Sequence, residues 1–162
     1  MDVLTPIVSI QKIRPNAITP YYATLMSAGA DLSACVEKLL NPFERTLIPI
    51  GFSMAIPVGF EAQIRPRSGL ALKGVTVVNS PGTIDAGYRG EICVILGSST
   101  GQPPFLPEPN NRTAKVGNAE LGVGDRIAQL VIQPVLNVEM EEVESVGENT
   151  DRGAKGFGST GV

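Results

Sequence analysis

The chain reads Asn79-Ser-Pro-Gly-Thr-Ile-Asp85-Ala-Gly-Tyr88-Arg-Gly-Glu91 between two runs rich in β-branched residues, Val75-Thr-Val-Val78 and Ile92-Cys-Val-Ile95. β-Branched runs on both sides of a segment rich in glycine and proline predict a β-hairpin whose loop is that segment. Pro81 and the glycines of the loop let backbone amides and carbonyls approach a flat ligand closely.

Two side chains of this loop suggest chemistry. The chain has no histidine, so a general base working near neutral pH must be Asp, Glu, Lys, Tyr or Cys. Asp85, inside the loop, is the best placed of these. Tyr88 follows three residues later and offers a ring face to a sugar or a base.

Composition predicts one all-β domain. A chain of 162 residues suits a single domain, and its 18 glycines and 13 prolines are spread along the whole length, which favours many short strands over helices. No apolar run approaches the ~20 residues that cross a bilayer, so we expect no membrane partner. The first residues lack the features of a signal peptide, which predicts a cytoplasmic protein.

Charge and cysteine usage narrow the function further. The net charge of −3 and the pI near 5.0 argue against a nucleic-acid-binding surface, which requires a basic patch. Cys35 and Cys93 have neither CxxC spacing nor a histidine partner. We therefore expect buried, reduced thiols in preference to a metal site or a disulfide.

Period-two patterns predict strands before the loop. Ile7–Ile10 begins as a strand. Phe52, Met54 and Ile56 share one face of a second strand, and after the turn at Pro57-Val-Gly59 the residues Phe60, Ala62 and Ile64 share one face of a third, opposite Glu61, Gln63 and Arg65. We interpret the second and third strands as a hairpin with one buried side.

The segment Arg65-Pro-Arg-Ser-Gly-Leu-Ala-Leu-Lys73 predicts a short helix that ends before Gly74. The free N–H groups of its first turn, beside Arg67 and Ser68, would suit an anion. Taken alone, the segment is an equally good capped surface turn with solvated arginines.

Two further segments combine small residues, an acid and an amide. In Ser27–Ala34 the simplest interpretation is a turn that leads into a strand, with Asp31 capping the loop. In Gly122–Ile132 a period-two strand carries Gln129 among apolar residues, where a lone Gln is normally a satisfied core or interface group.

The remaining segments lack regular patterns. Residues 97–122 read as a long surface loop, for which a solvated insertion is favoured over a partner-binding role. Glu139, Glu141, Glu142 and Glu144 read as a solvated edge. Residues 151–162 form a glycine-rich tail that composition alone would assign to disorder, although it carries a cation, an aromatic ring and hydroxyls.

Five of these segments, in order, resemble the five signature motifs of the homotrimeric dUTPases: Ser27–Ala34, Arg65–Ala71, Asn79–Glu91, Gly122–Ile132 and Asp151–Val162. The resemblance implies an all-β fold, a distorted jelly-roll barrel that assembles as a homotrimer. It implies residues 1–150 as one domain and 151–162 as a C-terminal arm that crosses to a neighbouring subunit. Each active site would then be built from three chains.

The resemblance also implies residue roles. Asp85 would hold and activate the attacking water, and Tyr88 would pack on the deoxyribose. Asp31 would touch a magnesium ion (Mg2+) indirectly, through metal-bound water. The uracil pocket would contain Asn79, Gly82, Thr83, Ile84 and Cys93. The phosphates would contact Arg67, Ser68, Gly69, Gln129, Arg152, Gly158, Ser159 and Thr160, with Phe157 stacked over uracil.

The implied reaction is hydrolysis of dUTP to dUMP and pyrophosphate by attack of water at the α-phosphorus, which limits uracil in DNA and supplies dUMP for dTMP synthesis. Two features depart from the family pattern: the long segment 97–122, where relatives are usually about a dozen residues shorter, and Lys155 in the tail. Two alternatives stay open, a dCTP deaminase of the same fold and a dUTPase-like regulatory protein that binds a protein partner through the 97–122 loop.

Overall fold

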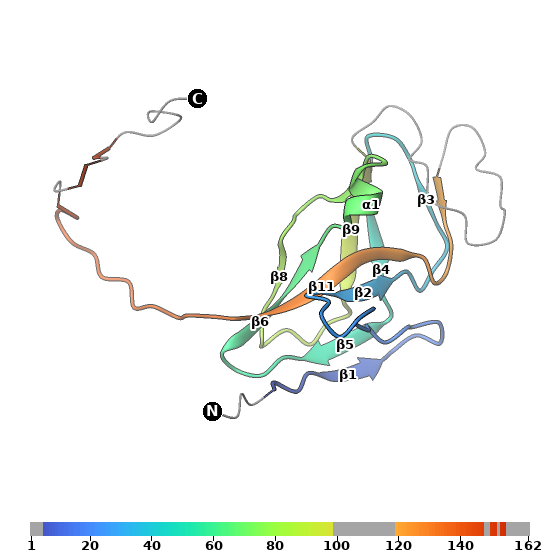
Figure 1. Cartoon of the computed structure of the whole chain (residues 1–162), viewed down its shortest axis with the longest axis horizontal. Helices are drawn as coiled ribbons and strands as arrows, with labels where there is room; N and C mark the ends of the chain where they lie inside the picture. The colour runs from blue at the N-terminus through green and yellow to red at the C-terminus, as the bar shows by residue number, and fades with distance from the viewer. Residues whose placement is uncertain (1–4, 99–118, 148–149, 152, 155–162) are drawn as a thin grey trace.

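The computed structural model describes residues 5–98, 119–147, 150–151 and 153–154. Over these residues the chain is almost entirely β, as expected (Figure 1). The elements, in order, are β1 (Ser9–Lys12), β2 (Ala30–Ser33), β3 (Lys38–Leu40), β4 (Arg45–Pro49), β5 (Phe52–Ala55), β6 (Phe60–Arg65), α1 (Ser68–Ala71), β7 (Val75–Val77), β8 (Gly82–Ile84), β9 (Cys93–Ser98), β10 (Ala119–Leu121) and β11 (Arg126–Pro134).

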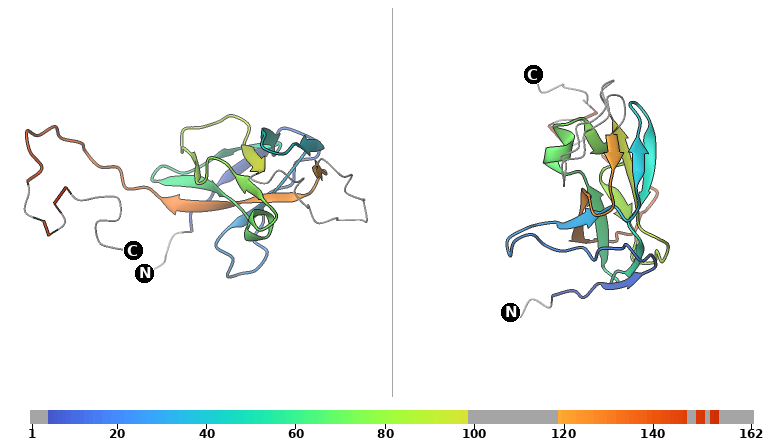
Figure 2. Two further views of the ribbon diagram at one scale, coloured as in Figure 1. Left: turned by 90° about the horizontal axis from the view of Figure 1, so that it is seen from above. Right: turned by 90° about the vertical axis from the view of Figure 1, so that its right-hand side faces the viewer.

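Two antiparallel sheets form the body of the molecule, one in the order β2-β11-β6-β8 and the other in the order β4-β9-β7. Two short pairs, β1-β5 and β10-β3, complete the strand arrangement. The end-on view in Figure 2 shows the strands gathered around a common interior. That interior is one apolar cluster to which both sheets contribute side chains. The first sheet contributes Leu32, Ala62 and Ile127, and the second contributes Ile48 and Leu96.

The period-two faces predicted from sequence are confirmed. In β6, Ala62 and Ile64 are buried in the core. Side chains on its opposite face bond to one another, since Gln63 Nε2 donates to Glu61 Oε1 at 2.6 Å and Arg65 Nη2 donates to Gln63 Oε1 at 2.6 Å. The alternation of a strand thus places an apolar row inside and a hydrogen-bonded polar row outside.

The predicted hairpin of residues 52–64 is wrong in its pairing. β5 pairs with β1, whereas β6 pairs with β11 on one side and β8 on the other. The turn at Pro57-Val-Gly59, with Gly59 at a φ of 87°, directs the two strands into different sheets. Periodicity identifies a strand's buried face but not its neighbour.

The hairpin around residues 79–91 is confirmed in its outer strands and corrected in its loop. β7 and β9 pair antiparallel, with Val77 opposite Leu96. The stretch between them is more than a loop because it contains β8, which leaves this sheet and pairs with β6 in the other one. The sequence Gly82-Thr-Ile84 is too short to show a period, so only the tertiary pairing reveals this strand.

Smaller differences concern element boundaries. The first strand is Ser9–Lys12 instead of Ile7–Ile10, and Asp31 lies within β2 instead of capping a turn. The ends of the 97–122 segment belong to β9 and β10, and residues 99–118 lie outside the described part of the chain. Most of the predicted C-terminal arm, residues 152 and 155–162, is also outside it.

After β11 the chain leaves the body of the molecule. Figure 1 shows the segment from Val135 onward extending away from both sheets. Glu139, Glu141, Glu142 and Glu144 are solvent-exposed, as predicted, but no strand is described there. Apolar side chains alternate along the segment and are also exposed, with Leu136 87% and Met140 86% accessible. Among the described residues the single helix, α1, spans four residues and is far too short to cross a membrane.

Gly51 gives the first prediction, because its φ is 84° and a Cβ there would lie 2.9 Å from Ala17 Cβ and 3.1 Å from Cys35 Sγ. We expect Gly51→Ala to lower the free energy of unfolding by about 2–4 kcal/mol, from left-handed backbone strain plus overpacking.

Gly59→Ala is the matched control. Gly59 has nearly the same φ, 87°, but a Cβ there meets no atom within 4 Å. Its cost should be about 1–2 kcal/mol, from backbone strain alone. Urea unfolding at one protein concentration measures both variants, and equal losses would contradict the crowding at Gly51.

Candidate functional site

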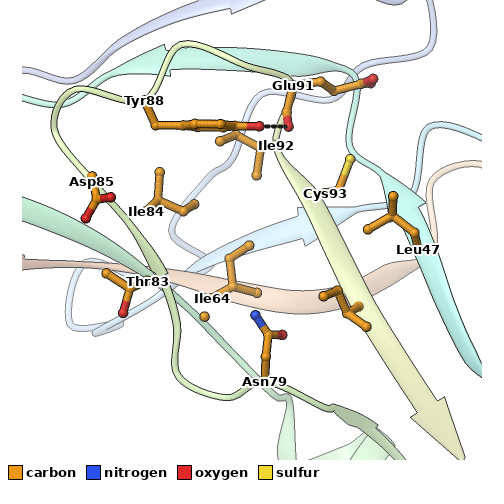
Figure 3. A pocket seen from close by; sticks show the side chains of 12 residues that line it. Leu47, Ile64, Asn79, Thr83, Ile84, Asp85, Tyr88, Glu91, Ile92 and Cys93 are labelled. Atoms are coloured by element: carbon orange, nitrogen blue, oxygen red, sulfur yellow. Dashed lines mark hydrogen bonds between the residues drawn. The ribbon is translucent and has the colours of Figure 1, made fainter.

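A cavity of about 330 Å³ lies beside the 79–91 stretch (Figure 3). We call it the hairpin pocket. It brings together the described residues that the sequence assigned to water, base and sugar, whereas Phe157, also assigned to uracil, lies outside the described part of the chain. Its lining consists of Leu47, Ile64, Asn79, Gly82, Thr83, Ile84, Asp85, Tyr88, Glu91, Ile92, Cys93 and Ile95. Apolar side chains of β4, β6 and β9 form its walls, and the polar groups come from the stretch itself.

β8 gives the hairpin pocket a row of main-chain groups. The strand pairs with β6 on one side only, with Thr83 opposite Gln63 and Gly82 opposite Ile64, and it ends its sheet. The N–H and C=O groups on an edge strand's unpaired side are free to bond a ligand. A planar base placed along β8 therefore meets alternating donors and acceptors.

Asn79 and Asp85 flank β8. The Asn79 amide points into the pocket in Figure 3 and packs on Gly82, where a Cβ would lie 3.1 Å from Asn79 Nδ2. Asp85 directly follows the strand, its side chain is exposed, and its carboxylate accepts no hydrogen bond from the described residues. Its oxygens are thus available to a water molecule.

The Tyr88 ring is held in place by its neighbours. Its hydroxyl donates to the Glu91 carbonyl oxygen at 3.1 Å, and the ring lies over Gly90, where a Cβ would collide with it. Arg89 Nη1 donates to the carbonyl oxygens of Ala86 and Tyr88 at 2.6 and 2.8 Å. The turn at 85–91 therefore presents Tyr88 in one orientation at the pocket rim.

Both cysteines are free, as predicted. Cys35 is buried and its thiol donates to the Pro49 carbonyl oxygen at 3.2 Å. Cys93 is only half-buried, contrary to the expectation of burial, because its side of β9 opens into the hairpin pocket. Burial raises the pKa of the Cys93 thiol, which keeps it protonated and able to donate a hydrogen bond.

A second cavity, of about 550 Å³, lies between β2, β11 and α1. We call it the arginine pocket. It gathers the predicted residues Asp31, Arg67, Ser68, Gly69 and Gln129, and it adds two cations, Lys73 and Arg126, that the sequence reading left out of the site. The rest of its lining is Ala23, Ser27, Ala28, Gly29 and Leu70.

Asp31 organises the cations of the arginine pocket. Its Oδ1 forms an ion pair with Arg67 Nε, 3.1 Å away, and its Oδ2 accepts a hydrogen bond from Arg126 Nη1 at 3.0 Å. Arg67 Nη1 donates to the Arg126 carbonyl oxygen at 2.9 Å. The hydrogen bond to Asp31 raises the pKa of Arg126. One carboxylate thus fixes the directions of two guanidinium groups.

The ion pairs of Asp31 with Arg67 and Arg126 limit how Asp31 can bind the expected magnesium ion. Among the described residues no three potential ligands cluster, and Asp31 is the single carboxylate of the arginine pocket. Mg²⁺ demands six oxygens in octahedral geometry, which one acid already bonded to two arginines does not supply. The donor set fits a metal held by phosphate oxygens and water, with Asp31 in its outer shell.

Gln129 and the start of α1 complete the arginine pocket. Gln129 lies opposite Asp31 in β2 and Arg65 in β6, and its Nε2 donates to the Pro66 carbonyl oxygen at 2.9 Å. It packs on Gly29, where a Cβ would lie 2.6 Å from its Oε1. The first N–H groups of a helix have no intrahelical acceptor, and at the start of α1 no side-chain cap satisfies them.

The two pockets of one chain share no lining residue among those described. Both pockets contain predicted residues, and they also contain residues that sequence reasoning left out of the site: the wall residues Leu47, Ile64, Ile92 and Ile95, the acid Glu91, and the cations Lys73 and Arg126. Lys73 and Arg126 belong to the segments 65–73 and 122–132 that the sequence analysis identified, so their positive charge could have indicated an anion site there. Leu47 reaches the hairpin pocket because β4 pairs with β9, and the Glu91 side chain is held by its ion pair with Arg14. Neither contact can be predicted from a local sequence pattern. Arg152, Phe157, Gly158, Ser159 and Thr160 lie outside the described residues.

Comparison with known proteins gives a consistent result. The dUTPase family model matches residues 15–118 and 117–161. A deoxyuridine 5'-triphosphate nucleotidohydrolase of Hydrogenobaculum sp. is 47% identical over 94% of this chain and 96% of its own length, and one of Wolbachia sp. subsp. Brugia malayi is 50% identical over 88% and 84%. The dUTPase of Staphylococcus bacteriophage 80alpha, solved with dUPNHPP, superposes with a TM-score of 0.81 at 30% identity, covering 98% of this chain and 100% of that one.

The Glu91 carboxylate generates a pH prediction, because its hydrogen bonds from Arg14 lower its pKa. A carboxyl whose folded pKa is depressed stabilises the fold above its unfolded pKa, near ~4.3, and the benefit is lost as pH falls through the folded value. Glu91→Gln should therefore lower the melting temperature at pH 7, and the deficit should close as pH falls below about 4.

Glu141→Gln, at an exposed acid of the C-terminal extension, serves as the control and should match the parent at both pH values. Thermal unfolding followed by circular dichroism measures the difference. A Glu91→Gln deficit of constant size from pH 7 to pH 3 would show that the charge contributes nothing to stability.

Proposed function

The chain belongs to the dUTPase family and hydrolyses dUTP to dUMP and pyrophosphate, and we propose that its hairpin pocket holds the base and sugar while an arginine pocket holds the phosphates. One observation carries this division. Among the described residues the hairpin pocket is lined by an amide, strand-edge main chain and two carboxylates, Asp85 and the Arg14-paired Glu91, but by no cation, whereas the arginine pocket contains three cations. The first set suits a neutral base and the second suits a triphosphate.

Uracil is recognised by Asn79 and the free edge of β8, from Gly82 to Ile84, with Cys93 beside it. Uracil presents a ring N–H between two carbonyl oxygens, and cytosine presents a ring acceptor beside an amino group. A site built from fixed polar partners leaves those partners unpaired with the wrong base and can discriminate by ~10⁴ or more. We assign the exclusion of the thymine methyl group, by size, to the apolar wall that contains Ile64 and Ile95.

Tyr88 packs on the deoxyribose. Its ring is fixed by the hydrogen bond to the Glu91 carbonyl oxygen and by contact with Gly90, so it does not retreat to accommodate a ribose 2′-hydroxyl. Because the ring cannot move away, a ribose 2′-hydroxyl would clash with it, and ribonucleotides bind less well than deoxyribonucleotides.

The triphosphate lies in the arginine pocket. Arg67, Ser68, Gly69 and Gln129 supply its donors, and we add Arg126 and Lys73, whose charges the pocket also contains. From the C-terminal arm, Arg152, Gly158, Ser159 and Thr160 contact the phosphates and Phe157 covers uracil. Asp31 keeps the guanidinium groups oriented before an anion arrives, which reduces reorganisation during reaction. Magnesium, bound by phosphate oxygens with Asp31 in its outer shell, would neutralise charge on pyrophosphate.

Asp85 holds the attacking water and accepts its proton as the oxygen bonds to the α-phosphorus. Its position directly after β8, in the lining of the hairpin pocket near Tyr88, supports this role, because the proposed sugar site carries the α-phosphate. The lack of a competing hydrogen bond from the described residues leaves both oxygens for the water. Electron density then passes to the bridging oxygen, and pyrophosphate leaves.

The protein acts as a homotrimer in which the hairpin pocket of one subunit faces the arginine pocket of another. Two observations support this arrangement. The pockets share no lining residue within one chain, although a single dUTP must contact both. The segment after β11 also extends away from the body of the molecule, and its apolar side chains Leu136, Val138 and Met140 are exposed. Exposed apolar side chains of this kind are typical of a surface that packs against another chain.

The alternatives receive no support. The relatives reported above are named as dUTP nucleotidohydrolases, and none of the observations favours a dCTP deaminase. Residues 99–118, on which the regulatory hypothesis depends, lie outside the described chain. A cytoplasmic location remains a prediction from sequence.

Replacing Asp85 tests the chemical step. Asp85→Asn keeps the shape of the side chain but removes the base, so we expect kcat to fall by on the order of 10²–10⁴ while binding of a non-hydrolysable dUTP analogue is largely kept. Pyrophosphate release and calorimetric titration measure the two quantities. Wild-type turnover in this variant would remove Asp85 from the mechanism.

Mixing two inactive variants tests the shared site. Asp85→Asn removes the general base from the hairpin pocket, and Arg67→Gln removes a phosphate-binding cation from the arginine pocket. If each site joins two different chains, equal amounts refolded together should regain about a quarter of wild-type activity, because one site in four then combines two intact halves. Activity no higher than the mean of the parents would place both pockets of a site on one chain. Thermal unfolding confirms that each parent folds.

A further inference from the structure

An ion pair between Glu91 and Arg14, a residue outside the five motif segments, holds the end of the 79–91 stretch. Arg14 Nε donates to Glu91 Oε1 at 2.5 Å and Arg14 Nη2 donates to Glu91 Oε2 at 2.7 Å, across 77 positions of sequence. Two parallel bonds between a planar guanidinium and a carboxylate fix direction as well as distance. Lysine at this position would supply the charge without the fork.

Both partners are anchored to the same segment, residues 50–52. The Ile13 and Arg14 amides donate to the Gly51 carbonyl oxygen at 2.8 and 3.1 Å. On the other side, the Ile92 amide donates to the Phe52 carbonyl oxygen at 2.9 Å. The backbone of Arg14 and that of Ile92, the residue after Glu91, are therefore held by the same segment, which reduces the entropy lost when the pair forms.

Glu91 passes this constraint to the hairpin pocket. Its side chain lines the pocket, and its carbonyl oxygen accepts the bond from the Tyr88 hydroxyl at 3.1 Å. Gly90, between them, is the residue on which the Tyr88 ring lies. A shift of Glu91 would move both the acceptor and the surface that hold the ring.

We propose that Arg14 is a positioning residue for sugar recognition: its fork on Glu91 holds the Tyr88 ring where a ribose 2′-hydroxyl does not fit. The inference rests on the proposed role of Tyr88 and adds a residue outside the motif segments to that role. Arg14 lines neither pocket. Its removal therefore affects binding and discrimination more than the chemical step.

The experiment measures pyrophosphate release from dUTP and from UTP. In Arg14→Gln and in Glu91→Gln, we expect KM for dUTP to rise about threefold to tenfold, the preference for dUTP over UTP in kcat/KM to fall about tenfold, and kcat for dUTP to change less than about twofold. The double variant should be no worse than either single one, because the two residues act as one unit. Arg14→Lys should lie between wild type and Arg14→Gln.

Arg45→Gln is the matched control, since Arg45 is an exposed arginine on β4 that lines neither pocket, and it should behave as wild type. Circular dichroism sets an assay temperature at which every variant is folded. If Arg14→Gln melts earlier but keeps wild-type KM and wild-type discrimination, the pair only stabilises the fold and the inference is wrong.

Tyr88→Ala separates this inference from the proposed function on which it rests. If Tyr88→Ala loses discrimination against UTP while Arg14→Gln keeps it, only the positioning role of Arg14 fails. If Tyr88→Ala itself keeps full discrimination, the sugar-packing role of Tyr88 fails, and the role of Arg14 fails with it.

Discussion

The pairing of β8 with β6 is the constraint from which the rest of the site follows. β7 and β9 belong to one sheet, yet the chain between them adds a strand to the edge of the other sheet and then returns. This detour encloses the hairpin pocket, leaves one edge of β8 unpaired, and places Asp85 directly after the strand. Gly82 tolerates the close approach of Asn79, and Gly90 tolerates the Tyr88 ring. The glycines of the stretch are therefore packing requirements around one short strand.

The arginine pocket follows a different logic, based on charge. Asp31 is bonded to Arg67 and Arg126, so the cations are held at fixed directions and their mutual repulsion is offset in the absence of an anion. Gln129 is held in the same way by the Pro66 carbonyl oxygen. On our proposal, substrate binding joins this prearranged set to the hairpin pocket of a neighbouring chain. Assembly is then a condition for catalysis as well as for stability.

The limits of sequence prediction follow from the range of each interaction. Local alternation correctly placed Ala62 and Ile64 inside, and the short helix after Arg67 was also correct. The partner strands of β5 and β6 were wrong because periodicity carries no information about pairing. Arg14 drew no attention because its partner lies 77 positions away. The resemblance to dUTPase motifs named residues that the structure gathers into two pockets and implied a site built from three chains, but it did not indicate which of these residues share a pocket within one chain.

The most direct test of this account is pyrophosphate release by the wild-type protein, with magnesium, from dUTP, dCTP, dTTP and UTP at equal concentration. We expect release from dUTP and little from the other three, because the β8 edge and Asn79 reject cytosine, the apolar wall rejects the thymine methyl group, and Tyr88 rejects the ribose. Equal release from all four nucleotides would contradict it, since the hairpin pocket would then not be the site that selects the substrate.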